Sequence, residues 1–403
     1  MTAGTGTGKD PARVMRARTL DEVEAAADAL LAEVGITRVA DITDLDTVGV
    51  PVFQAVRPTA EDGLNTVTNG KGLTPQAARV SAIMEGIERY CSELHDRVPV
   101  TDSYAALAQS SAVLDPRRLI LSAQSSWTPD TLIDWWQAQA VSHGNAAVWV
   151  PAAAVFKPFP QGADLLRPHT IGLAAGSTWE EAVLHGLFEV LEHDAIAHGQ
   201  LLGLGWQVRP ESLPPAAQPL LQGLADSGIT VYIQAYPSAI RVPALFVVIE
   251  DTIFQDPMLV NGGASVNVDL EVSLLRALTE ATQSRLSVIG GAREDLDGQS
   301  GRRAAPYEEA RRHLAAWKGN REWRDFGELQ PDGECLPAEP LPTVLGQLEE
   351  AGMPLVLAAD LTPRGWPFAV AKVIVPGAEV AHVHQDRIGP RLIRASKEAK
   401  ASA

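Results

Sequence analysis

Residues 70–90, GKGLTPQAARVSAIMEGIERY, decide the fold of this chain. The glycines of Gly70-Lys71-Gly72 predict a tight turn, and Thr74 before a proline is typical of a helix start, because its side chain caps free backbone N–H groups. The predicted helix carries Glu85 and Glu88. Residues three apart lie on nearly the same helical face, so the two carboxylates project together.

The same pattern occurs three times, with the second copy 104 residues and the third 195 residues after the first. Each copy has a cap, an acid eleven positions later, and a further acid or amide three positions after that: Thr74, Glu85, Glu88; Thr178, Glu189, Glu192; Asp269, Glu280, Gln283. Internal repeats indicate repeated structural units. We therefore predict repeated β-loop-α units that build one compact body with the three helices facing one another.

The segments around the repeats alternate between strand and helix patterns. Predicted strands cover 36–42, 48–56, 132–138, 147–151 with a continuation over 152–156, 230–236, 243–250, 355–360 and 369–375; predicted helices cover 20–34, 210–224, 306–317 and 344–351; 59–69 is predicted to be a loop. This alternation predicts an α/β (α+β) fold. We expect a flexible segment over 1–18, a single domain over 19–390 and a polar tail over 391–403.

Composition excludes several classes of protein. The net charge of −17 repels phosphate backbones, so no nucleic-acid partner is expected. Cys91 and Cys335 have no CxxC spacing, which indicates a reducing compartment. No apolar run reaches the roughly 18 residues of a membrane span, and the N-terminus lacks the pattern of a signal peptide. We expect a cytoplasmic location without a membrane partner.

The paired glutamates favour a site for a hard divalent cation. Four carboxylates in one cleft repel one another unless positive charge lies between them, and Mg²⁺ prefers oxygen ligands. Surface ion pairs on two solvated helix faces are the simpler interpretation of any single ExxE pair. Here the acids recur at one offset in largely apolar helices, which favours inward-facing groups.

The Gly-Lys-Gly turn and the third copy favour a nucleotide beside that cation. Lys71 precedes a helix N-terminus, where a point cation, backbone N–H groups and the helix dipole together attract an anion. Neither a GxxxxGK[ST] nor a GxGxxG motif is present. Arg285 is suited to a phosphate and Gln283 to a ribose or base edge. A simple turn and a surface helix end remain the alternatives for these two segments.

The three blocks, residues 70–90, 172–195 and 267–285, resemble the signature blocks of the YcaO family, and the flanks 36–41, 49–52 and 375–377 extend the resemblance. Members of this family use ATP and Mg²⁺ to phosphorylate a peptide-bond oxygen after a nucleophile has attacked the amide carbon. A Cys, Ser or Thr side chain gives an azoline, external sulfide a thioamide, and an amine an amidine. The resemblance implies the family's fold, with ATP held between the helices, and a peptide or protein substrate.

Site residues also follow from the resemblance. It implies that Mg²⁺ faces the carboxylates Glu85, Glu88, Glu189 and Glu192. It places seven residues around ATP: Lys71, Ser81, Arg89, His193, Glu280, Gln283 and Arg285. No residue is assigned as a catalytic acid, base or nucleophile.

Two positions depart from the family pattern. Ile171 stands where the family usually has an Asn that contacts ATP, and His193 stands where an Arg usually follows the second ExxE pair. Isoleucine offers no hydrogen bond, and histidine is mostly neutral at pH 7. We expect an active enzyme, with a catalytically degenerate scaffold that binds a peptide or partner as the alternative.

The subtype of the family is predicted from the ends of the chain. The residues 395–403 lack the PxPxP form common in azole-forming members, and no extra leader-binding domain is evident. This layout looks more like the stand-alone or TfuA-partnered members that make thioamides. A TfuA-like sulfide-delivering partner and a homodimer are further expectations from the resemblance.

Other kinds of site have weaker support in the sequence. His382 and His384 predict two imidazoles on one face of a strand, the beginning of a zinc site, but no third ligand is evident. His193-Asp194 with Ser177 is a conceivable hydrolase set, yet no GxSxG elbow supports it. A different carboxylate-rich Mg²⁺ enzyme acting on nucleotides stays open.

Overall fold

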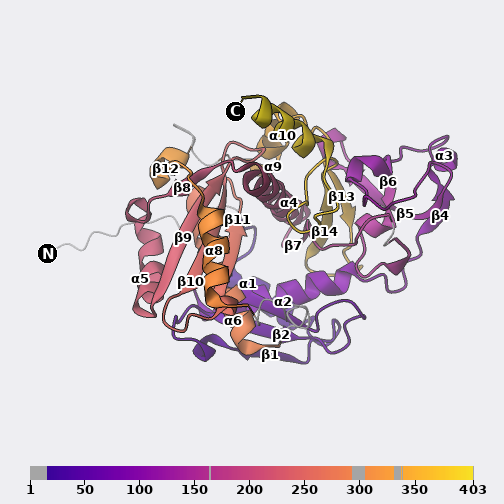
Figure 1. Cartoon of the computed structure of the whole chain (residues 1–403). Coiled ribbons are helices and arrows are strands. Elements are labelled where there is room, and N and C mark those ends of the chain that lie inside the picture. Colours follow the sequence, from indigo (N-terminus) through magenta and orange to yellow (C-terminus); the bar gives the residue numbers. More distant parts are fainter. Residues whose placement is uncertain (1–15, 163–164, 293–304, 331–336, 338, 403) are drawn as a thin grey trace.

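The computed structural model describes residues 16–162, 165–292, 305–330, 337 and 339–402 (Figure 1). Its helices are α1 (Leu20–Asp28), α2 (Pro75–Ser92), α3 (Tyr104–Leu107), α4 (Trp179–Leu202), α5 (Gln218–Asp226), α6 (Leu270–Gly290), α8 (Tyr307–Lys318), α9 (Pro340–Glu350) and α10 (Pro390–Ser402). Its strands are β1 (Arg38–Asp41), β2 (Val52–Val56), β3 (Val67–Lys71), β4 (Val100–Ser103), β5 (Leu132–Ala140), β6 (Ala146–Pro151), β7 (Leu173–Gly176), β8 (Trp206–Val208), β9 (Ile229–Tyr236), β10 (Ala244–Asp251), β11 (Val260–Ser265), β12 (Trp323–Arg324), β13 (Leu357–Asp360) and β14 (Ala369–Ile374). Most of the predicted flexible segment, residues 1–15, lies outside the described part of the chain.

The strands form three sheets. Their orders are β1-β2-β3, β11-β10-β9-β8-β12, and β4-β5-β13-β14-β7 with β6 also paired to β5. Within the described residues, the strand pairs are antiparallel except for β12 with β8. The mixed architecture predicted from the sequence is therefore confirmed as α+β.

Each repeat is a strand that leads into a long helix: β3 into α2, β7 into α4, and β11 into α6. The predicted loop over 59–69 and the predicted turn at Gly70-Lys71-Gly72 are corrected here, because residues 67–71 are strand β3. This strand is rich in small residues since the helix lies directly on it. A Cβ on Gly70 would stand 2.0 Å from the backbone nitrogen of Ala82, and one on Gly263 in β11 would stand 2.3 Å from that of Ala281.

The three repeats pack in a closed ring (Figure 1). Helix α2 covers β2 and β3 and also contacts β7; α4 covers β7 and β14 and also contacts β10 and β11; α6 covers β10 and β11 and also contacts β3. The last contact includes a hydrogen bond from the Asn69 side-chain amide to the Ser287 hydroxyl at 2.7 Å. Each helix thus touches its own sheet and a strand of another repeat.

Helix α4 lies in the middle of the molecule, between two sheets (Figure 1). Side chains from most of its circumference are buried, including Leu187, Phe188 and Leu191. A helix that is apolar nearly all round is one covered on several sides. Glu189 and Glu192 of α4 are accordingly half-buried between packed elements and do not lie on a fully solvated face.

Other sequence predictions are partly corrected. The predicted strand over 152–156 is a 3₁₀ turn at Ala152–Ala154, and the predicted helix over 210–224 begins only at Gln218. The polar stretch 391–403, expected to be a tail, lies in α10 as far as Ser402. Helix α10 packs on α4, with Arg391 2.6 Å from Asp194. Among the described residues, no helix is long and apolar enough to cross a membrane.

Candidate functional site

The caps predicted from the sequence set the starts of the three central helices. The hydroxyl of Thr74 accepts a hydrogen bond from the Ala77 N–H at 3.2 Å, and Thr178 accepts one from Glu181 at the same distance. Asp269 caps α6 in the same way. Because the three helices start alike and lie in a ring, their acids fall at matching depths.

The segment that leads into β7 joins the acids of two helices. The backbone N–H of Ala175 donates to Glu88 Oε1 at 2.8 Å, and the N–H of Gly172 donates to Glu189 Oε2 at 2.9 Å. Glu88 belongs to α2 and Glu189 to α4, so a single short segment holds a carboxylate from each repeat. The structure therefore brings one acid of each ExxE pair to the same backbone segment, and the region between these acids is called the cleft below.

The buried acids of this cleft are hard to ionise. Burial raises the pKa of Glu88 to about 8, and the nearby Glu85 and Glu189 charges add to the shift. Burial also raises the pKa of Glu189 to about 7, and burial with the Glu280 charge raises that of Glu192 well above its usual range. Buried carboxylates that repel one another hold protons near neutral pH unless a cation replaces them. The cleft is therefore short of positive charge.

Helix α6 contributes the third wall. Glu280 forms an ion pair with Lys71, at the end of β3, and its charge raises the pKa of Glu192. One turn before it, Arg276 lies 2.9 Å from the ring of His185 on α4. Burial and these two cations lower the pKa of His185 to about 3, so its ring is neutral. Sequence reasoning missed Arg276 and His185, although Arg276 precedes Glu280 by one helical turn.

The remaining predicted residues of α2 and α6 lie on the same helices as the acids. Arg89 donates to Glu85 at 2.9 Å, and Ser81 lies one turn before Glu85. Gln283 follows Glu280 by three residues and is partly exposed. Their spacing places them beside the cleft acids along each helix.

Arg285 does not share this arrangement. It is 3% exposed and forms ion pairs with Asp46 at 2.7 Å and Asp251 at 2.8 Å. Five residues from Glu280, it leaves α6 in a different direction from the cleft acids. Because its guanidinium is committed to two buried carboxylates, we leave Arg285 out of the nucleotide site that we propose below.

His193 likewise points elsewhere. Its Nδ1 lies 2.8 Å from the Nε2 of His382, and burial lowers its pKa to about 3. Asp194 is bound to Arg391 and not aligned with a serine, which leaves the hydrolase interpretation without support. His382 lies in a turn and not on a strand, which corrects that expectation.

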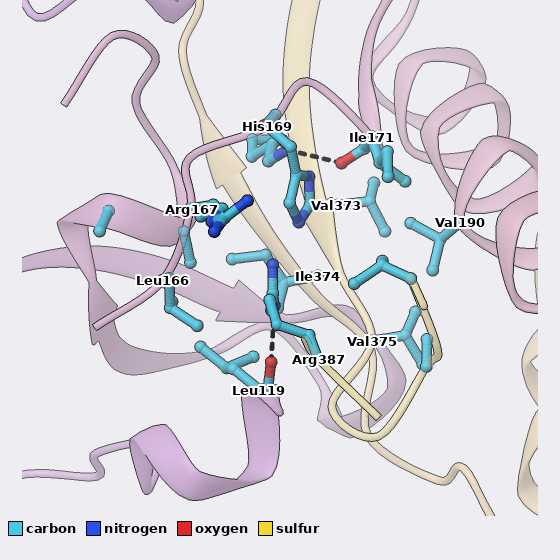
Figure 2. Close-up of a pocket in the computed structure, with 15 residues that line it drawn as sticks. Leu119, Leu166, Arg167, His169, Ile171, Val190, Val373, Ile374, Val375 and Arg387 are labelled. Atoms are coloured by element: carbon cyan, nitrogen blue, oxygen red, sulfur yellow. Dashed lines mark hydrogen bonds between the residues drawn. The ribbon is translucent and has the colours of Figure 1, made fainter. Parts of the chain in front are cut away.

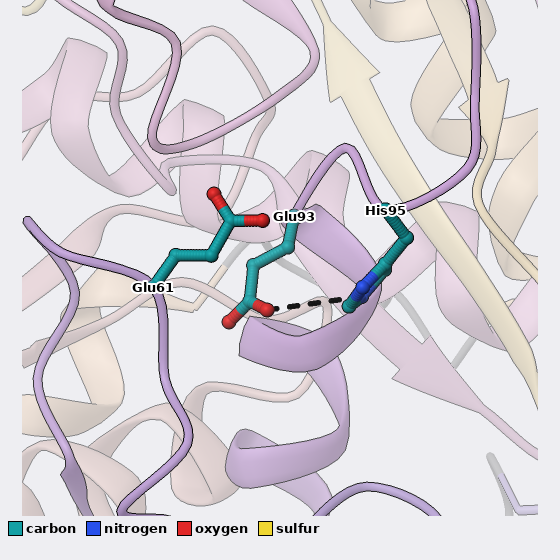
Figure 3. Close-up of side chains that lie close together, drawn as sticks. All are labelled: Glu61, Glu93 and His95. Carbon is teal, nitrogen blue, oxygen red and sulfur yellow. Dashed lines mark ion pairs between the residues drawn. The ribbon is translucent and has the colours of Figure 1, made fainter.

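One cluster of described residues has three metal-ligand atoms all within 4.8 Å of one another: Glu61, Glu93 and His95 (Figure 3). It is not a convincing metal site. Glu93 is paired with the buried Arg57, and the ring Nε2 of His95 lies 2.7 Å from the carbonyl oxygen of Tyr90, so that it donates there. His382 and His384 belong to no such cluster among the described residues, so the zinc hypothesis gains no third ligand.

The cleft glutamates are spread more widely than a single ion's ligands. Their donor chemistry nevertheless fits Mg²⁺, which takes oxygen ligands and is commonly held by one or two carboxylates together with waters and substrate phosphates. Burial and mutual repulsion raise the pKa values of Glu88, Glu189 and Glu192, and a cation bound among them would offset both effects. The residues present therefore fit Mg²⁺ bound with a nucleotide.

Lys372, on β14, supplies a cation that sequence reasoning missed. Its Nζ donates to the backbone carbonyls of His169 and Ile171, and the side chain is fully buried. Burial lowers its pKa to about 7, against the attraction of Glu189. The visible signal was a lone lysine inside the apolar strand AVAKVI.

Comparisons with known proteins show the family of the chain. The family model described as YcaO cyclodehydratase, ATP- and Mg²⁺-binding, matches residues 69–379. The chain belongs to the YcaO family. ATP and Mg²⁺, implied by the resemblance, are the ligands that the family description names.

Individual relatives agree. An uncharacterized protein of Methanothermobacter thermautotrophicus is 36% identical over 386 residues, covering 90% of this chain and 94% of the relative. An uncharacterized protein in the tfuA 3′ region of Rhizobium leguminosarum bv. trifolii is 28% identical, covering 91% and 89%. The structure of YcaO from Methanopyrus kandleri bound with AMPPCP and Mg²⁺ has a similar fold, with a TM-score of 0.75 at 24% identity, covering 93% of this chain and 95% of that one.

Proposed function

We propose that this protein uses ATP and Mg²⁺ to phosphorylate the oxygen of a peptide-backbone amide in a ribosomally made peptide or protein, giving a thioamide or an azoline. The observation that carries the proposal is the cleft in which Glu88 of α2 and Glu189 of α4 are held by one backbone segment. The charge of Glu280 on α6 acts on Glu189 and Glu192 of α4. Three repeats thus contribute to a single site, as phosphoryl transfer to a positioned acceptor requires.

Within the site, the chain's own residues bind and orient. Glu85, Glu88, Glu189 and Glu192 would hold Mg²⁺ on two sides of the cleft. When bound, Mg²⁺ neutralises charge on the transferring phosphoryl group and aligns it.

The cations around the acids would bind the nucleotide. Lys71 at the end of β3 and Arg89 on α2 supply positive charge at the edge of the cleft, where both are partly exposed. Ser81 and Gln283 lie on the same helices and offer hydrogen bonds. His193 is neutral and turned to His382, so we propose that it contributes structure rather than charge.

A second candidate function follows from two residues. Ile171 is 6% exposed and packs in the core, and neutral His193 replaces a cation that the family usually has. Both changes weaken nucleotide binding relative to the family pattern. A catalytically degenerate scaffold that binds a peptide or a partner without consuming ATP is therefore the alternative.

Among the products, we favour the thioamide. The relative encoded in a tfuA 3′ region supports a TfuA-like partner that delivers sulfide. The description of the family as cyclodehydratase supports the azoline. Cytoplasmic location and a homodimer remain predictions, which fractionation and light scattering would test.

The proposal is tested by phosphate release with ATP, Mg²⁺, sulfide and a peptide taken from a gene beside this one. Wild-type protein should release phosphate and increase the peptide mass by 16 Da if oxygen is replaced by sulfur, which is roughly the mass difference of these elements. Glu85→Gln and Glu192→Gln should abolish both signals, since each removes a charge that holds the cation. Glu180→Gln, on the exposed first turn of α4, is the matched control.

Nucleotide binding separates the two candidates. Calorimetry with a non-hydrolysable ATP analogue and Mg²⁺ should show binding to wild type and none to Glu192→Gln. Absence of nucleotide binding by the wild type, with peptide and partner present, would refute the enzyme and leave the scaffold.

A further inference from the structure

A cavity lies beside the segment whose backbone holds Glu189. It has a volume of about 50 Å³ and lies between β14, the segment before β7 and the 3₁₀ turn Ala152–Ala154 (Figure 2). Ile171 and Lys372 line it, while the neighbouring Gly172 N–H binds Glu189. The cavity is therefore a separate space, one peptide unit away from the proposed metal ligands.

Basic residues from different parts of the chain meet in this cavity. Arg167, His169, Lys372 and Arg387 line it, and Figure 2 shows Arg167, His169 and Arg387 around one space. All other lining residues are apolar, among them Leu119, Val373 and Ile374, and none is an acid. A cavity with basic and apolar walls but no acidic residue is unusual in a protein with a net charge of −17.

Two of these basic groups have a buried nitrogen without a partner. Arg387 is 4% exposed; its Nε and Nη2 donate to the carbonyls of Ile120 and Leu119 at 2.8 Å, but its Nη1 has no hydrogen-bond partner. The Nδ1 of His169 is also buried without a partner, and it is a second donor in the neutral tautomer that carries its proton on Nδ1. Buried polar groups are almost always satisfied, so each exception calls for an explanation.

The basic residues that line the cavity also differ in whether a carboxylate lies close to them. Arg167 lies 3.8 Å from Asp386, and Lys372 is attracted by Glu189. Among the described residues, Arg387 has no carboxylate within ion-pair distance. Asp386 and Glu379 attract Arg387 only from a greater distance, and a buried guanidinium without a close counter-charge is costly. An anion in the cavity would supply both the missing charge and the missing hydrogen-bond acceptor.

We propose that this cavity binds a small, singly charged anion through the Nη1 of Arg387 and the Nδ1 of His169. The free donors are few and the rest of the wall is apolar, which suits an anion with one or two acceptor atoms better than a tetrahedral oxyanion. A space of about 50 Å³ exceeds the 10–15 Å³ that one water requires and is small for a larger ligand. Arg167, whose side chain is 58% exposed, marks the entrance.

A small, singly charged anion of this kind can be either a carboxylate or an inorganic anion such as hydrosulfide. We would therefore titrate full-length protein with sodium formate and, anaerobically, with sodium hydrosulfide, in a gluconate buffer of matched ionic strength. The readout is the thermal unfolding midpoint, since a ligand of the folded state raises it in a saturable manner. A saturable rise of a few degrees with either anion supports the site, and the more effective anion indicates the source.

Variants locate the binding. Ala154→Leu extends a lining side chain into the cavity without changing charge, and Arg387→Met removes the free donor. Each should weaken the titration at least tenfold, whereas Arg364→Met, at an exposed arginine, should not change it. If Arg387→Met does not fold, Ala154→Leu still decides the question.

The site would be refuted if neither anion gives a saturable rise, or if Ala154→Leu responds like the wild type. Crystals soaked in sodium bromide provide a direct test, with an anomalous peak expected beside Arg387 Nη1; no peak there would also refute the proposal. These experiments use neither ATP nor peptide. Their failure would thus leave the proposed function untouched, and the failure of that function would leave this site standing.

Discussion

Helices α2 and α4 carry the same pair of glutamates at the same distance from a threonine cap, but they obtain their positive charge differently. On α2, Arg89 lies one turn after Glu85 and pairs with it at 2.9 Å. At the corresponding position of α4, His193 is neutral and turned to His382. The cation that lowers the pKa of Glu189 most is Lys372, on β14, and Arg89 contributes less.

This difference shows which properties a repeat preserves. Caps, helix starts and carboxylates depend on local sequence, so they recur at one offset. The cation that neutralises each acid depends on what packs against the helix. Helix α4 lies between two sheets, whereas α2 has one face nearer the surface. A cation can therefore be supplied by the same helix in one repeat and by a distant strand in another.

The largest effect is expected from the acids that the two helices share. Glu88→Gln on α2 and Glu189→Gln on α4 should each lower ATP turnover by about 100-fold or more, the range seen when one group that stabilises a developing charge is removed. Peptide-dependent phosphate release measures the effect. Equal losses would mean that the two halves of the cleft act together.

A second measurement distinguishes this loss from simple unfolding. Both variants remove a buried carboxylate whose pKa is raised, so in the absence of Mg²⁺ each should unfold at the same temperature as wild type or higher. Lower stability together with lost activity would indicate a structural role and contradict our assignment.

The next effect concerns the two cations. Lys372→Met removes a charge that lowers the pKa of Glu189, and Arg89→Met removes one that lowers the pKa of both Glu88 and Glu189. Without either cation the acids lose their protons only at higher pH. In a plot of turnover rate against pH, the acidic limb should therefore shift to higher pH by about one unit, which is equivalent to 1.36 kcal/mol.

The matched control for the cations is Lys397→Met, at an exposed position of α10. Turnover at pH 7 should fall roughly tenfold in the two test variants, following from that one-unit shift, and should recover at higher pH. A loss that is the same at every pH would contradict electrostatic tuning and indicate damaged packing.

A smaller effect is expected from making α4 resemble α2. His193→Arg, combined with His382→Ala to create space, restores a cation after the second glutamate pair. Nucleotide affinity measured by calorimetry should rise by about 3- to 10-fold, up to 1.4 kcal/mol. His382→Ala alone is the control. Unchanged affinity would mean that an arginine at position 193 does not strengthen nucleotide binding in this protein, and that the pair of His193 and His382 serves its substrate equally well.

The smallest effect is the pH dependence of stability. The pKa of Glu88 is about 8 when folded and 4.5 in its ordinary range, so the folded state binds more protons than the unfolded state between these values. Stability then falls as pH rises through this window. Without Mg²⁺, the unfolding midpoint should drop by a few degrees between pH 6 and 8, since 1 kcal/mol moves it roughly 2–4 °C in a domain of 150–250 residues.

Glu88→Gln provides the comparison for this measurement. Its midpoint should change less over the same pH range, because an amide does not titrate. Adding Mg²⁺ with a non-hydrolysable nucleotide should reduce the wild-type drop. A steeper pH dependence in Glu88→Gln than in wild type would contradict the raised pKa.

The capped starts of the three helices were predictable because local signals carry them, and the structure confirms the caps. The roles of the four glutamates, Lys71 and Glu280 at Mg²⁺ and ATP stay predictions. Strand β3 was missed because Gly70 sits under α2, and close helix packing selects small residues that do not look like a strand. Strand propensity is a weak guide to structure where close packing decides which residue type fits.

Contacts of single residues were missed for the same reason. Arg285 matched the expected pattern, and the sequence did not show that Asp46 and Asp251 approach it from distant segments. Lys372 matched no motif and acquires its role only when β14 packs against α4. Such partners depend on tertiary contacts, which no local pattern records.

The position of Lys372 in the chain has a consequence for synthesis. Glu189 leaves the ribosome about 180 residues before Lys372, a delay of roughly 10–35 s at 5–20 residues per second. During that interval α4 has neither β14 as a cover nor this cation near its acid. A nascent chain therefore exposes an apolar, acidic helix until almost its last strand appears, and a stalled or truncated product would present that helix to chaperones and proteases.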